Sequence, residues 1–418
     1  MTAPRHLSST IVLKTQKAIT SGRFKLALAA AVVLTMLIPV VIAIHAGVYD
    51  SWFDNPLSSF GMWGVFVIYL WTRPHPKESL LVFCLAVILR ITHWLAANEY
   101  PYPGYSVINI GVYLPCFCLP ILVYRSFKGP QQSSHRLSLG GVLLLSYIGV
   151  FLAYYTSFAK IVCHYKLDYL LYSFDGTLGS HVNFMIGKAV STSEPLRIVL
   201  DTTYNSLGFF VALMVAVHIS LANNKLNILK LNIANSIIGF SLYFLYPAMG
   251  PKYAFSSFPQ LPGTVPLSAA VLDGVPNAMP SLHFATTLLI FFIARPWKWL
   301  RWITGVYLGA MLFAVFGTGE HYMVDTIVAI PYALMIMALA SNTHERKRVL
   351  NLSVGMLTLW LLVLRFGAFE FWTSWGLVLT TIGTGFVMER RFAKGLWSVV
   401  NAAPESVRLS ATYRLPVS

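Results

Sequence analysis

Charged side chains are scarce in this sequence. Of its 418 residues only 11% are Asp, Glu, Lys or Arg, whereas 56% are hydrophobic. A soluble globular domain carries about 25% charged residues, so the composition excludes an ordinary soluble protein. The apolar residues also come in blocks of about 20, which match the hydrocarbon thickness of a bilayer. The sequence therefore predicts an all-α, multi-pass integral membrane protein.

Cysteine is rare as well, with four residues in the chain. Cys84, Cys116 and Cys118 fall inside apolar blocks, so the sequence implies no disulfide framework. The first 25 residues are polar and basic, and the apolar block after them has no small-residue cleavage site. We therefore interpret that block as a retained span rather than a removable signal peptide.

The net charge of +15 could indicate nucleic-acid binding. The basic residues, however, form short clusters between apolar blocks, and no basic domain lies outside these blocks. We therefore expect no nucleic-acid partner and interpret the clusters as the flanks of membrane spans.

About twelve apolar segments are candidates for transmembrane helices. They lie near residues 26–47, 57–71, 79–97, 106–124, 138–159, 204–222, 229–247, 277–294, 300–316, 322–341, 349–366 and 371–388. If the spans alternate and the amino terminus is cytoplasmic, all but seven of the 30 lysines and arginines fall in cytoplasmic segments. This is the asymmetry that the positive-inside rule requires, so we expect both termini in the cytoplasm.

The spans and their connections predict five parts of the chain. Two connections on the outer side are unusually long, at about 160–203 and 248–276, and long connections in compact folds are often functional. The predicted parts are a cytoplasmic tail (1–25), amino-terminal transmembrane helices of unknown role (26–160), a catalytic core (161–341), carboxy-terminal transmembrane helices (342–388) and a second cytoplasmic tail (389–418).

Two polar motifs interrupt the apolar background, and the second holds a histidine and an aspartate. His321 and Asp325 are spaced i, i+4, so on a helix their β-carbons would lie about 5–6 Å apart. Asp325 could fix the imidazole tautomer and leave the other nitrogen free as nucleophile or base. Insertion of an ionised Asp within a span costs about 2.5–3.5 kcal/mol of free energy, so such a residue is expected to have a specific role. A purely structural tie between helices is the alternative.

The first motif holds a second histidine, His283. Pro280 and Ser281 precede it as helix-start residues do. Both histidines are then expected at the outer ends of spans, near helix amino termini that favour an anion. Two histidines, one carboxylate and two positive helix ends predict a phosphate site. One histidine would attack phosphorus and the other would protonate the leaving alkoxide.

These motifs resemble a known family. Ser281-Leu282-His283-Phe284-Ala285, followed by His321-Tyr322-Met323-Val324-Asp325, is similar to the type 2 phosphatidic acid phosphatase superfamily. The closest-looking branch holds the fungal inositol phosphorylceramide synthases and related bacterial membrane proteins. The resemblance covers roughly residues 165–340. It implies a six-helix phosphatase-like bundle in the middle and carboxy-terminal part of the chain.

The resemblance also implies roles. His321 would form a phosphohistidine, Asp325 would orient it and His283 would be the general acid, with no metal or other cofactor. Two departures from the family pattern concern the phosphate clamp. The stretch 314–318 lacks the Arg that phosphatases of the superfamily carry, and Lys252 is the only basic residue in 246–252.

Further candidates surround this core. Lys252, Ser281 and Tyr322 are candidate ligands of the substrate phosphate, although Lys252 could be a solvated loop residue and Tyr322 part of an aromatic belt. Asp175 is more readily explained as a cap in a turn than as a catalytic group. Lys188 and Arg197 could hold a phosphate headgroup or lie on the surface.

The functional expectation is a lipid phosphotransferase in a bacterial inner membrane, with its site facing the extracytoplasmic side. A phosphoryl or phosphoalcohol group, such as phosphoinositol, would move from a phospholipid donor to a lipid acceptor. A lipid phosphatase with water as acceptor is the main alternative. A twelve-span transporter and a two-histidine, one-carboxylate metal site are weaker ones. The sequence predicts no oligomeric state.

Overall fold

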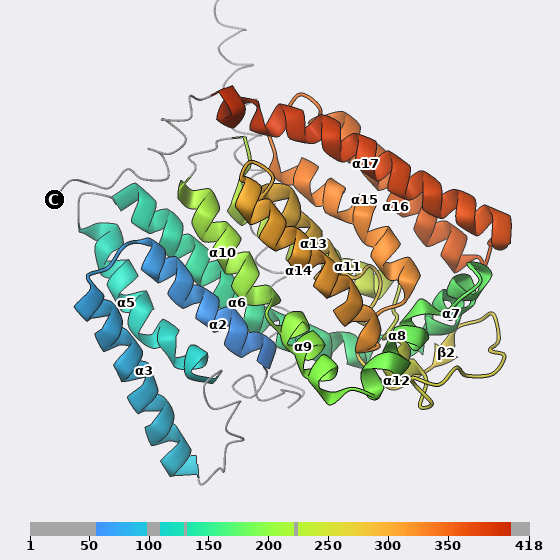
Figure 1. Ribbon diagram of the computed structural model, residues 1–418, viewed down its shortest axis with the longest axis horizontal. Coiled ribbons are helices and arrows are strands. Elements are labelled where there is room, and N and C mark those ends of the chain that lie inside the picture. The colour runs from blue at the N-terminus through green and yellow to red at the C-terminus, as the bar shows by residue number, and fades with distance from the viewer. Residues whose placement is uncertain (1–55, 98–108, 129–131, 221–224, 403–418) are drawn as a thin grey trace, which may run out of the picture.

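The architecture is taken from a computed structural model of the chain. It describes residues 56–97, 109–128, 132–220 and 225–402 (Figure 1). The predicted span at 26–47 lies outside these residues.

The described residues are mostly helical, as the apolar blocks predict. A single two-stranded antiparallel sheet joins Tyr165 to Val271 and Lys166 to Ala270. The elements in chain order are α2 (Pro56–Trp71), α3 (Pro76–Ala97), η1 (Ile110–Tyr113), α5 (Leu114–Phe127), α6 (Gln132–Val162), β1 (Tyr165–Lys166), α7 (Asp168–Thr177), α8 (Val182–Ser191), α9 (Glu194–Asn205), α10 (Leu207–Ser220), α11 (Ile228–Leu245), α12 (Pro251–Ala254), β2 (Ala270–Val271), α13 (Leu282–Ile293), α14 (Lys298–Gly317), α15 (Met323–Ala340), α16 (Arg346–Arg365) and α17 (Phe371–Ala402).

The amino-terminal helices form a layer of their own. Helix α2 packs against α5, α6 and α10, and α3 packs against α5 and η1. In Figure 1 these helices lie on the left, beside the bundle formed by α13 to α17. Helix α10 joins the two groups because it contacts both α2 and α13.

Helix α15 is the centre of the second bundle. It packs against α11, α13, α16 and α17. Of its 18 residues, 83% are buried inside the protein. A helix that is apolar all round is expected in such an interior position. Because α15 touches nearly every helix of the bundle, the residues at its amino terminus have their positions fixed from several sides.

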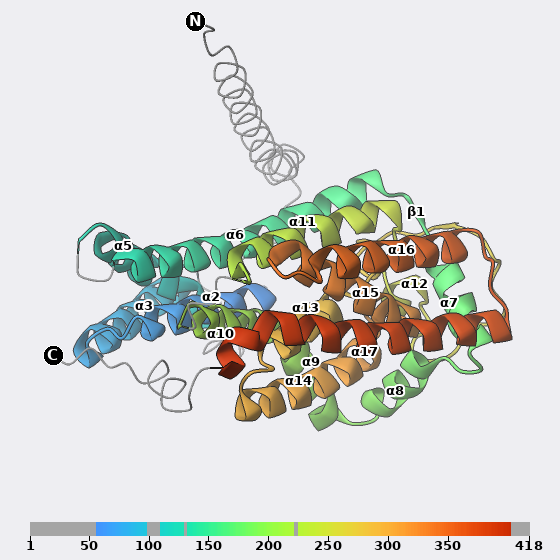
Figure 2. The same ribbon diagram turned by 90° about the horizontal axis from the view of Figure 1, so that it is seen from above.

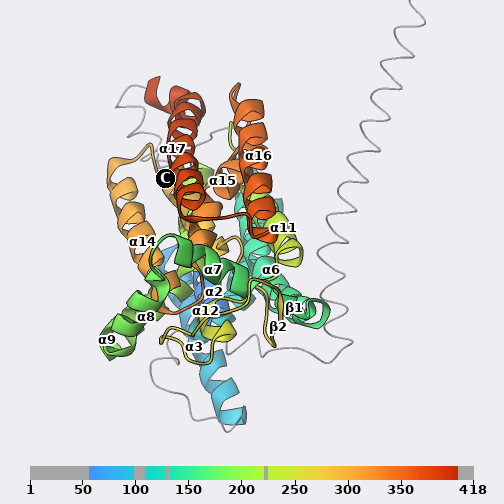
Figure 3. The ribbon, with the colours of Figure 1, turned by 90° about the vertical axis from the view of Figure 1, so that its right-hand side faces the viewer.

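The bundle has two distinct ends. Helices α11, α14 and α15 meet residues 246–281 and 318–322 at one end, which we call the loop end. Figure 3 looks onto it and shows α7, α12, β1 and β2 lying across it. The opposite end, which we call the basic end, holds the short connections 294–297 and 341–345. Figure 2 shows α15, α16 and α17 running between the two ends.

The number of spans differs from the prediction. Six helices of the described residues are long and apolar enough to cross a membrane, or seven if the pair Glu194–Asn205 and Leu207–Ile219, bent by 43°, is one span. The predicted total of about twelve is therefore not confirmed. Several predicted spans correspond to shorter apolar helices, such as Leu282–Ile293, which begins five residues later than predicted. Helix α17 continues through residue 388, where a tail was expected to begin.

Candidate active site

A buried carboxylate organises the loops over the candidate site. Both oxygens of Asp168 accept the backbone N–H of Met249, at 3.0 and 3.1 Å, and one also accepts that of Gly250 at 2.9 Å. The carbonyl of Ala248 in turn accepts the N–H groups of Asn277 and Ala278. Asp168 is 0% exposed. Burial raises the pKa of this carboxyl to about 6, although the bonds that it accepts oppose the shift.

Two glycines allow these loops to approach the histidine motif closely. Gly250 has φ 95°, and a β-carbon there would lie 2.2 Å from the carbonyl oxygen of Glu320. Gly319 has φ 73°, and a β-carbon there would lie 2.7 Å from the ring of Phe258. A hydrogen bond from the Lys252 N–H to the Gly319 carbonyl joins the two loops. Only glycine fits such positions without strain.

His321 follows this junction, two residues after Gly319 in the sequence. Its side chain is 0% exposed, and Nδ1 is 3.0 Å from the backbone carbonyl of Ala278. A carbonyl can only accept, so Nδ1 carries the proton and Nε2 carries the lone pair. Nε2 is buried and has no hydrogen-bond partner among the residues that the structure describes. In this tautomer Nε2 of His321 has a lone pair that no hydrogen bond uses, as a nucleophilic imidazole requires.

Asp325 relates to His321 differently from the sequence prediction. His321 precedes α15, whereas Asp325 lies in its first turn, so the two residues do not share a helical face. Oδ2 of Asp325 accepts the backbone N–H of Tyr322 at 2.8 Å and lies 3.6 Å from Nδ1 of His321. Ala278, not Asp325, accepts the imidazole proton. Asp325 therefore caps the helix and places its carboxyl group beside the ring.

Asp175 also holds the amino terminus of α15. Its two oxygens accept the backbone N–H groups of Met323 at 2.8 Å and Val324 at 3.0 Å. The prediction of a capping role is thus consistent with the structure, but the capped element is a helix 148 residues away and not the local turn. Burial raises the pKa of this carboxyl, and the neighbouring Asp325 adds to the shift.

His283 faces His321 from α13. The two ring centroids are 6.2 Å apart, and within the described part of the chain Nε2 of His283 is buried without a hydrogen-bond partner. Tyr204 of α9 stacks on the ring of His283, with centroids 3.8 Å apart and an interplanar angle of 18°. Ser281 caps α13 by accepting the Phe284 N–H at 3.3 Å, as predicted from its position before the helix. The two Nε2 atoms that lack a hydrogen-bond partner thus belong to neighbouring imidazole rings.

A rim of polar side chains lies beside His321. Nζ of Lys252 is 4.0 Å from Oε1 of Glu320, and its side chain is 53% exposed. Glu320 also accepts the Tyr253 hydroxyl at 2.9 Å and the Asn277 amide at 3.5 Å. Burial raises the pKa of Glu320, and the charge of Lys252 opposes this shift. Lys252 is therefore the cation next to the nucleophile motif, with its charge partly open to solvent.

The other predicted phosphate ligands lie elsewhere. Tyr322 is fully buried and its hydroxyl donates to Asp168 at 3.0 Å, so it is not at the mouth of the site. Lys188 is exposed on α8. Arg197 is exposed on α9 and pairs with Glu194 at 2.6 Å. The structure does not bring these three side chains to the two histidines.

Residues that the sequence reasoning did not select complete the surroundings. They are Tyr204, Glu320, Asp168 and the carbonyl of Ala278. Glu320 carries a sequence signal, because it is an acidic residue directly before His321 in an apolar region. Asp168 also carries one, as a charge in a stretch otherwise rich in leucine and tyrosine. Tyr204 and Ala278 carry none, because stacking and carbonyl acceptance depend on tertiary packing alone.

Burial determines the charge of the nucleophile candidate. It lowers the pKa of His321 to about 4, although Glu320 and the Ala278 carbonyl oppose the shift. The imidazole is therefore neutral at physiological pH, as a nucleophile must be. Within the described residues no group of three or more His, Cys, Asp or Glu is arranged to hold a metal ion.

Fold and site together define a membrane protein with a buried two-histidine centre at one end of a helical bundle. Residues 170–339 match the family model described as the PAP2 superfamily. The match runs from the third residue of α7 to the last but one residue of α15, so it includes His283, His321 and Asp325 but not Asp168. It supports a PAP2-superfamily segment in this chain and a phosphatase or phosphotransferase type of enzyme. No curated protein and no solved structure matches the chain significantly.

Proposed function

We propose that the protein is a lipid phosphotransferase that uses His321 as the nucleophile and His283 as the general acid and base. The observation that carries this proposal is the pair of buried, unpartnered Nε2 atoms on rings 6.2 Å apart. Buried polar atoms are normally hydrogen-bonded, so two orphaned nitrogens in neighbouring rings point to a ligand that bridges them. A phosphate group, with acceptor oxygens around one electrophilic atom, fits this requirement.

The first step of the proposed reaction cleaves the donor lipid. The lone pair of His321 Nε2 forms a bond to phosphorus while the bond from phosphorus to the leaving lipid oxygen breaks. His283, protonated beside the phosphate anion, gives its proton to that oxygen. The Ala278 carbonyl keeps the proton on Nδ1 of His321, and Asp325 stabilises the positive charge that develops on the ring.

The second step transfers the group from the phosphohistidine. His283, now neutral, takes the proton of an acceptor hydroxyl, and the acceptor oxygen forms a bond to phosphorus as the bond to Nε2 breaks. Lys252 would pair with the phosphate oxygens at the rim. The motifs resemble those of the inositol phosphorylceramide synthase branch, so phosphoinositol is the first headgroup to test. We place the reaction at the extracytoplasmic side on the basis of loop charge.

The missing arginine before His321 supports a lipid alcohol over water as acceptor. No Arg is present in 314–318, which departs from the pattern of the phosphatases. A lipid phosphatase remains the second candidate because the same two histidines would serve a water molecule.

The two candidates differ in their products. Purified full-length protein would be incubated in mixed micelles with phosphatidylinositol labelled in its phosphate, with and without a lipid alcohol such as ceramide or diacylglycerol. The proposal expects the label in a new lipid that forms only with the acceptor. Release of water-soluble inositol phosphate or free phosphate, with no labelled acceptor product, would contradict the transferase and favour the phosphatase. His321→Asn protein is the control and should give neither product.

A further inference from the structure

The basic end also carries a cleft, which lies far from the histidines. An open cleft of about 370 Å³ lies between α16 and α17. Its lining comes from two helix faces: Glu345, Arg348, Val349 and Leu352 on α16, and Gly383, Thr384, Val387, Met388 and Arg391 on α17. Helix α15 ends beside the start of α16, so the length of α15, about 27 Å at 1.5 Å per residue, separates this cleft from the catalytic loops.

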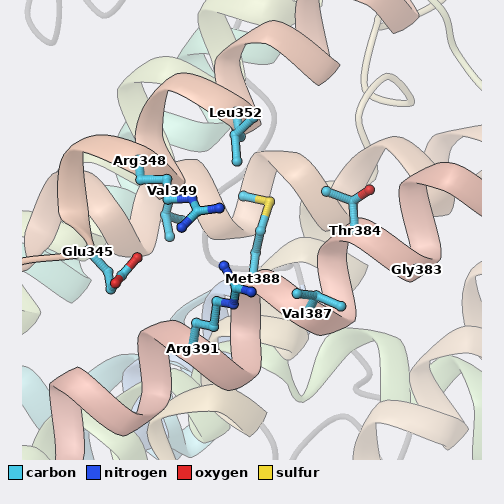
Figure 4. Close-up of a pocket in the computed structure, with 9 residues that line it drawn as sticks. All are labelled: Glu345, Arg348, Val349, Leu352, Gly383, Thr384, Val387, Met388 and Arg391. Carbon is cyan, nitrogen blue, oxygen red and sulfur yellow. The ribbon is translucent and has the colours of Figure 1, made fainter.

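Two arginines converge on this cleft without a protein partner. Figure 4 shows that the guanidinium groups of Arg348 and Arg391 point into the same space beside Met388. Both residues are exposed, and neither forms an ion pair within the part of the chain that the structure describes. Glu345, the one carboxylate in the lining, lies 3.4 Å from His344. Like charges that face each other without a counterion favour an anion between them.

The cleft changes from charged to apolar with depth. Helix α16 starts at the basic end, so Leu352 lies one turn deeper than Arg348. Helix α17 runs the opposite way, so Gly383 lies about two turns deeper than Arg391. A β-carbon on Gly383 would meet no atom within 4 Å, which means that the deeper groove is open there. Charge at the surface and an apolar groove below it match a phospholipid headgroup and its acyl chain.

We propose that the cleft between α16 and α17 binds one anionic membrane phospholipid, whose phosphate pairs with Arg348 and Arg391 and whose acyl chain lies along Leu352, Val387 and Gly383. The lining carries a net charge of about +1, which favours a lipid with one negative charge over a zwitterionic lipid. This lipid is not the substrate of the histidine site, because it is held at the other end of the bundle. It would join α16 and α17, which contact each other little along this cleft.

The test uses the purified full-length protein in a neutral detergent, titrated with phosphatidylglycerol. Bound lipid would be counted by native mass spectrometry and checked by the increase in Tm. Phosphatidylcholine with the same acyl chains and inorganic phosphate are the comparison probes. We expect one phosphatidylglycerol per chain, weaker binding of phosphatidylcholine and no Tm effect of inorganic phosphate at the same concentration.

Three variants separate headgroup, charge and groove. Replacing both arginines, Arg348→Gln with Arg391→Gln, should weaken phosphatidylglycerol binding about 25-fold, at roughly fivefold for each cation. The matched control, Lys347→Gln with Lys394→Gln, removes the same charge from the same end but not from the cleft and should change binding less than about twofold. Gly383→Leu fills the groove, should prevent lipid binding and should not lower Tm without lipid, because Leu favours the helix more than Gly does.

Three results would overturn the proposal. The first is equal weakening by the arginine and lysine pairs, which would indicate general surface attraction. The second is stabilisation by inorganic phosphate equal to that by the lipid, which would indicate a free-anion site. The third is unchanged binding in Gly383→Leu, and this result decides the question alone if the double arginine variant does not fold.

Discussion

The two ends of the bundle use charge in opposite ways. At the loop end four carboxylates, Asp168, Asp175, Glu320 and Asp325, are at most 8% exposed, and three of them accept backbone N–H groups. At the basic end the charged groups are mostly lysines and arginines on helix surfaces. They include Lys298, Arg301, Lys347, Arg348, Arg390, Arg391 and Lys394.

This difference shows what each end is built for. A buried carboxylate that accepts backbone N–H groups fixes a loop conformation, because breaking such bonds would leave a charge and several donors unpaired. The loop end therefore holds the backbone around the two histidines in one conformation. The basic end carries exposed cations that can meet lipid headgroups without any precise loop. If this account is correct, substitutions at the loop end should change chemistry, and substitutions at the basic end should change lipid association.

The largest expected effect is the loss of the nucleophile. His321→Asn removes the free Nε2 atom, so kcat for headgroup transfer should fall by at least about 10,000-fold. The measurement is transfer of labelled headgroup in mixed micelles. Lys347→Gln at the basic end is the control and should keep kcat within about twofold. Comparable losses in the two variants would remove the distinction between the ends.

Loss of the second histidine should lower kcat nearly as much, but the size of this loss should depend on the leaving group of the substrate. His283→Asn should lower kcat about 100- to 10,000-fold with a natural lipid, because an alkoxide then leaves without a proton. With a nitrophenyl phosphodiester, whose leaving group needs no proton, most of the loss in formation of the phosphoenzyme should disappear. Pre-steady-state release of nitrophenol measures this step. An equal loss with both substrates would contradict the role of His283 as an acid.

Asp175 is expected to act through the position of α15. Asp175→Leu removes both acceptors of the Met323 and Val324 N–H groups and should lower kcat about 100-fold, as a displacement of about 1 Å can, with little change in KM. Asp175→Asn keeps one carbonyl acceptor and should recover part of the activity. Asp201→Leu replaces an exposed acid of α9 and serves as control. A change in Tm without any change in kcat would reduce Asp175 to a stabilising residue.

Lys252 should contribute less, because its side chain is half exposed. Lys252→Gln should raise KM for the phospholipid about fivefold, which corresponds to roughly 1 kcal/mol for a solvent-screened ion pair, while Lys252→Arg should keep KM near its original value. Lys188→Gln, an exposed lysine of α8, is the matched control. Steady-state kinetics at fixed micelle composition give both constants. Equal KM values in the Lys252→Gln and Lys188→Gln variants would exclude a phosphate contact at Lys252.

The smallest effect is expected from pH. In His283→Asn with a nitrophenyl phosphodiester, His321 is the titrating group of the mechanism, and it must be neutral to attack. Because burial lowers the pKa of His321 to about 4, the neutral form persists above this value and is lost below it. The second-order rate of nitrophenol release should change less than about twofold between pH 5.5 and 7.5. An acidic limb near pH 6.5 would indicate a solvated imidazole.

The apolar segments predicted most helices of the bundle well. The predicted spans 229–247 and 322–341 correspond to α11 and α15 within about two residues, because an apolar block of bilayer length is a local property of the sequence. Helix α13 begins later than the predicted span, because the N–H groups of Asn277, Ala278 and Ser281 bond to the carbonyls of Ala248 and Asp325 outside the helix.

The site was predictable only in part. Motif chemistry brought His283, His321, Ser281 and Lys252 to attention, and the structure places them near one another. It could not show that Ala278 accepts the imidazole proton, that Asp175 caps a helix 148 residues away or that Tyr204 stacks on His283. Such contacts depend on which loops fold over the bundle, and no local spacing encodes them. For the same reason the sequence left Tyr322 as a candidate phosphate ligand or a member of an aromatic belt, whereas its hydroxyl donates to Asp168.

The central claim is that His321 carries the transferred group. Full-length protein would be mixed with phosphatidylinositol labelled in its phosphate and quenched within milliseconds in alkali. Phosphohistidine survives in alkali, whereas acyl phosphates do not. The quenched protein would then be digested for peptide mapping. The account predicts label on the peptide that contains His321, bound at Nε2, and no label in His321→Asn. In His283→Asn the label should appear more slowly but on the same residue. Label on any other residue, or none in the wild-type protein during rapid turnover, would contradict the account.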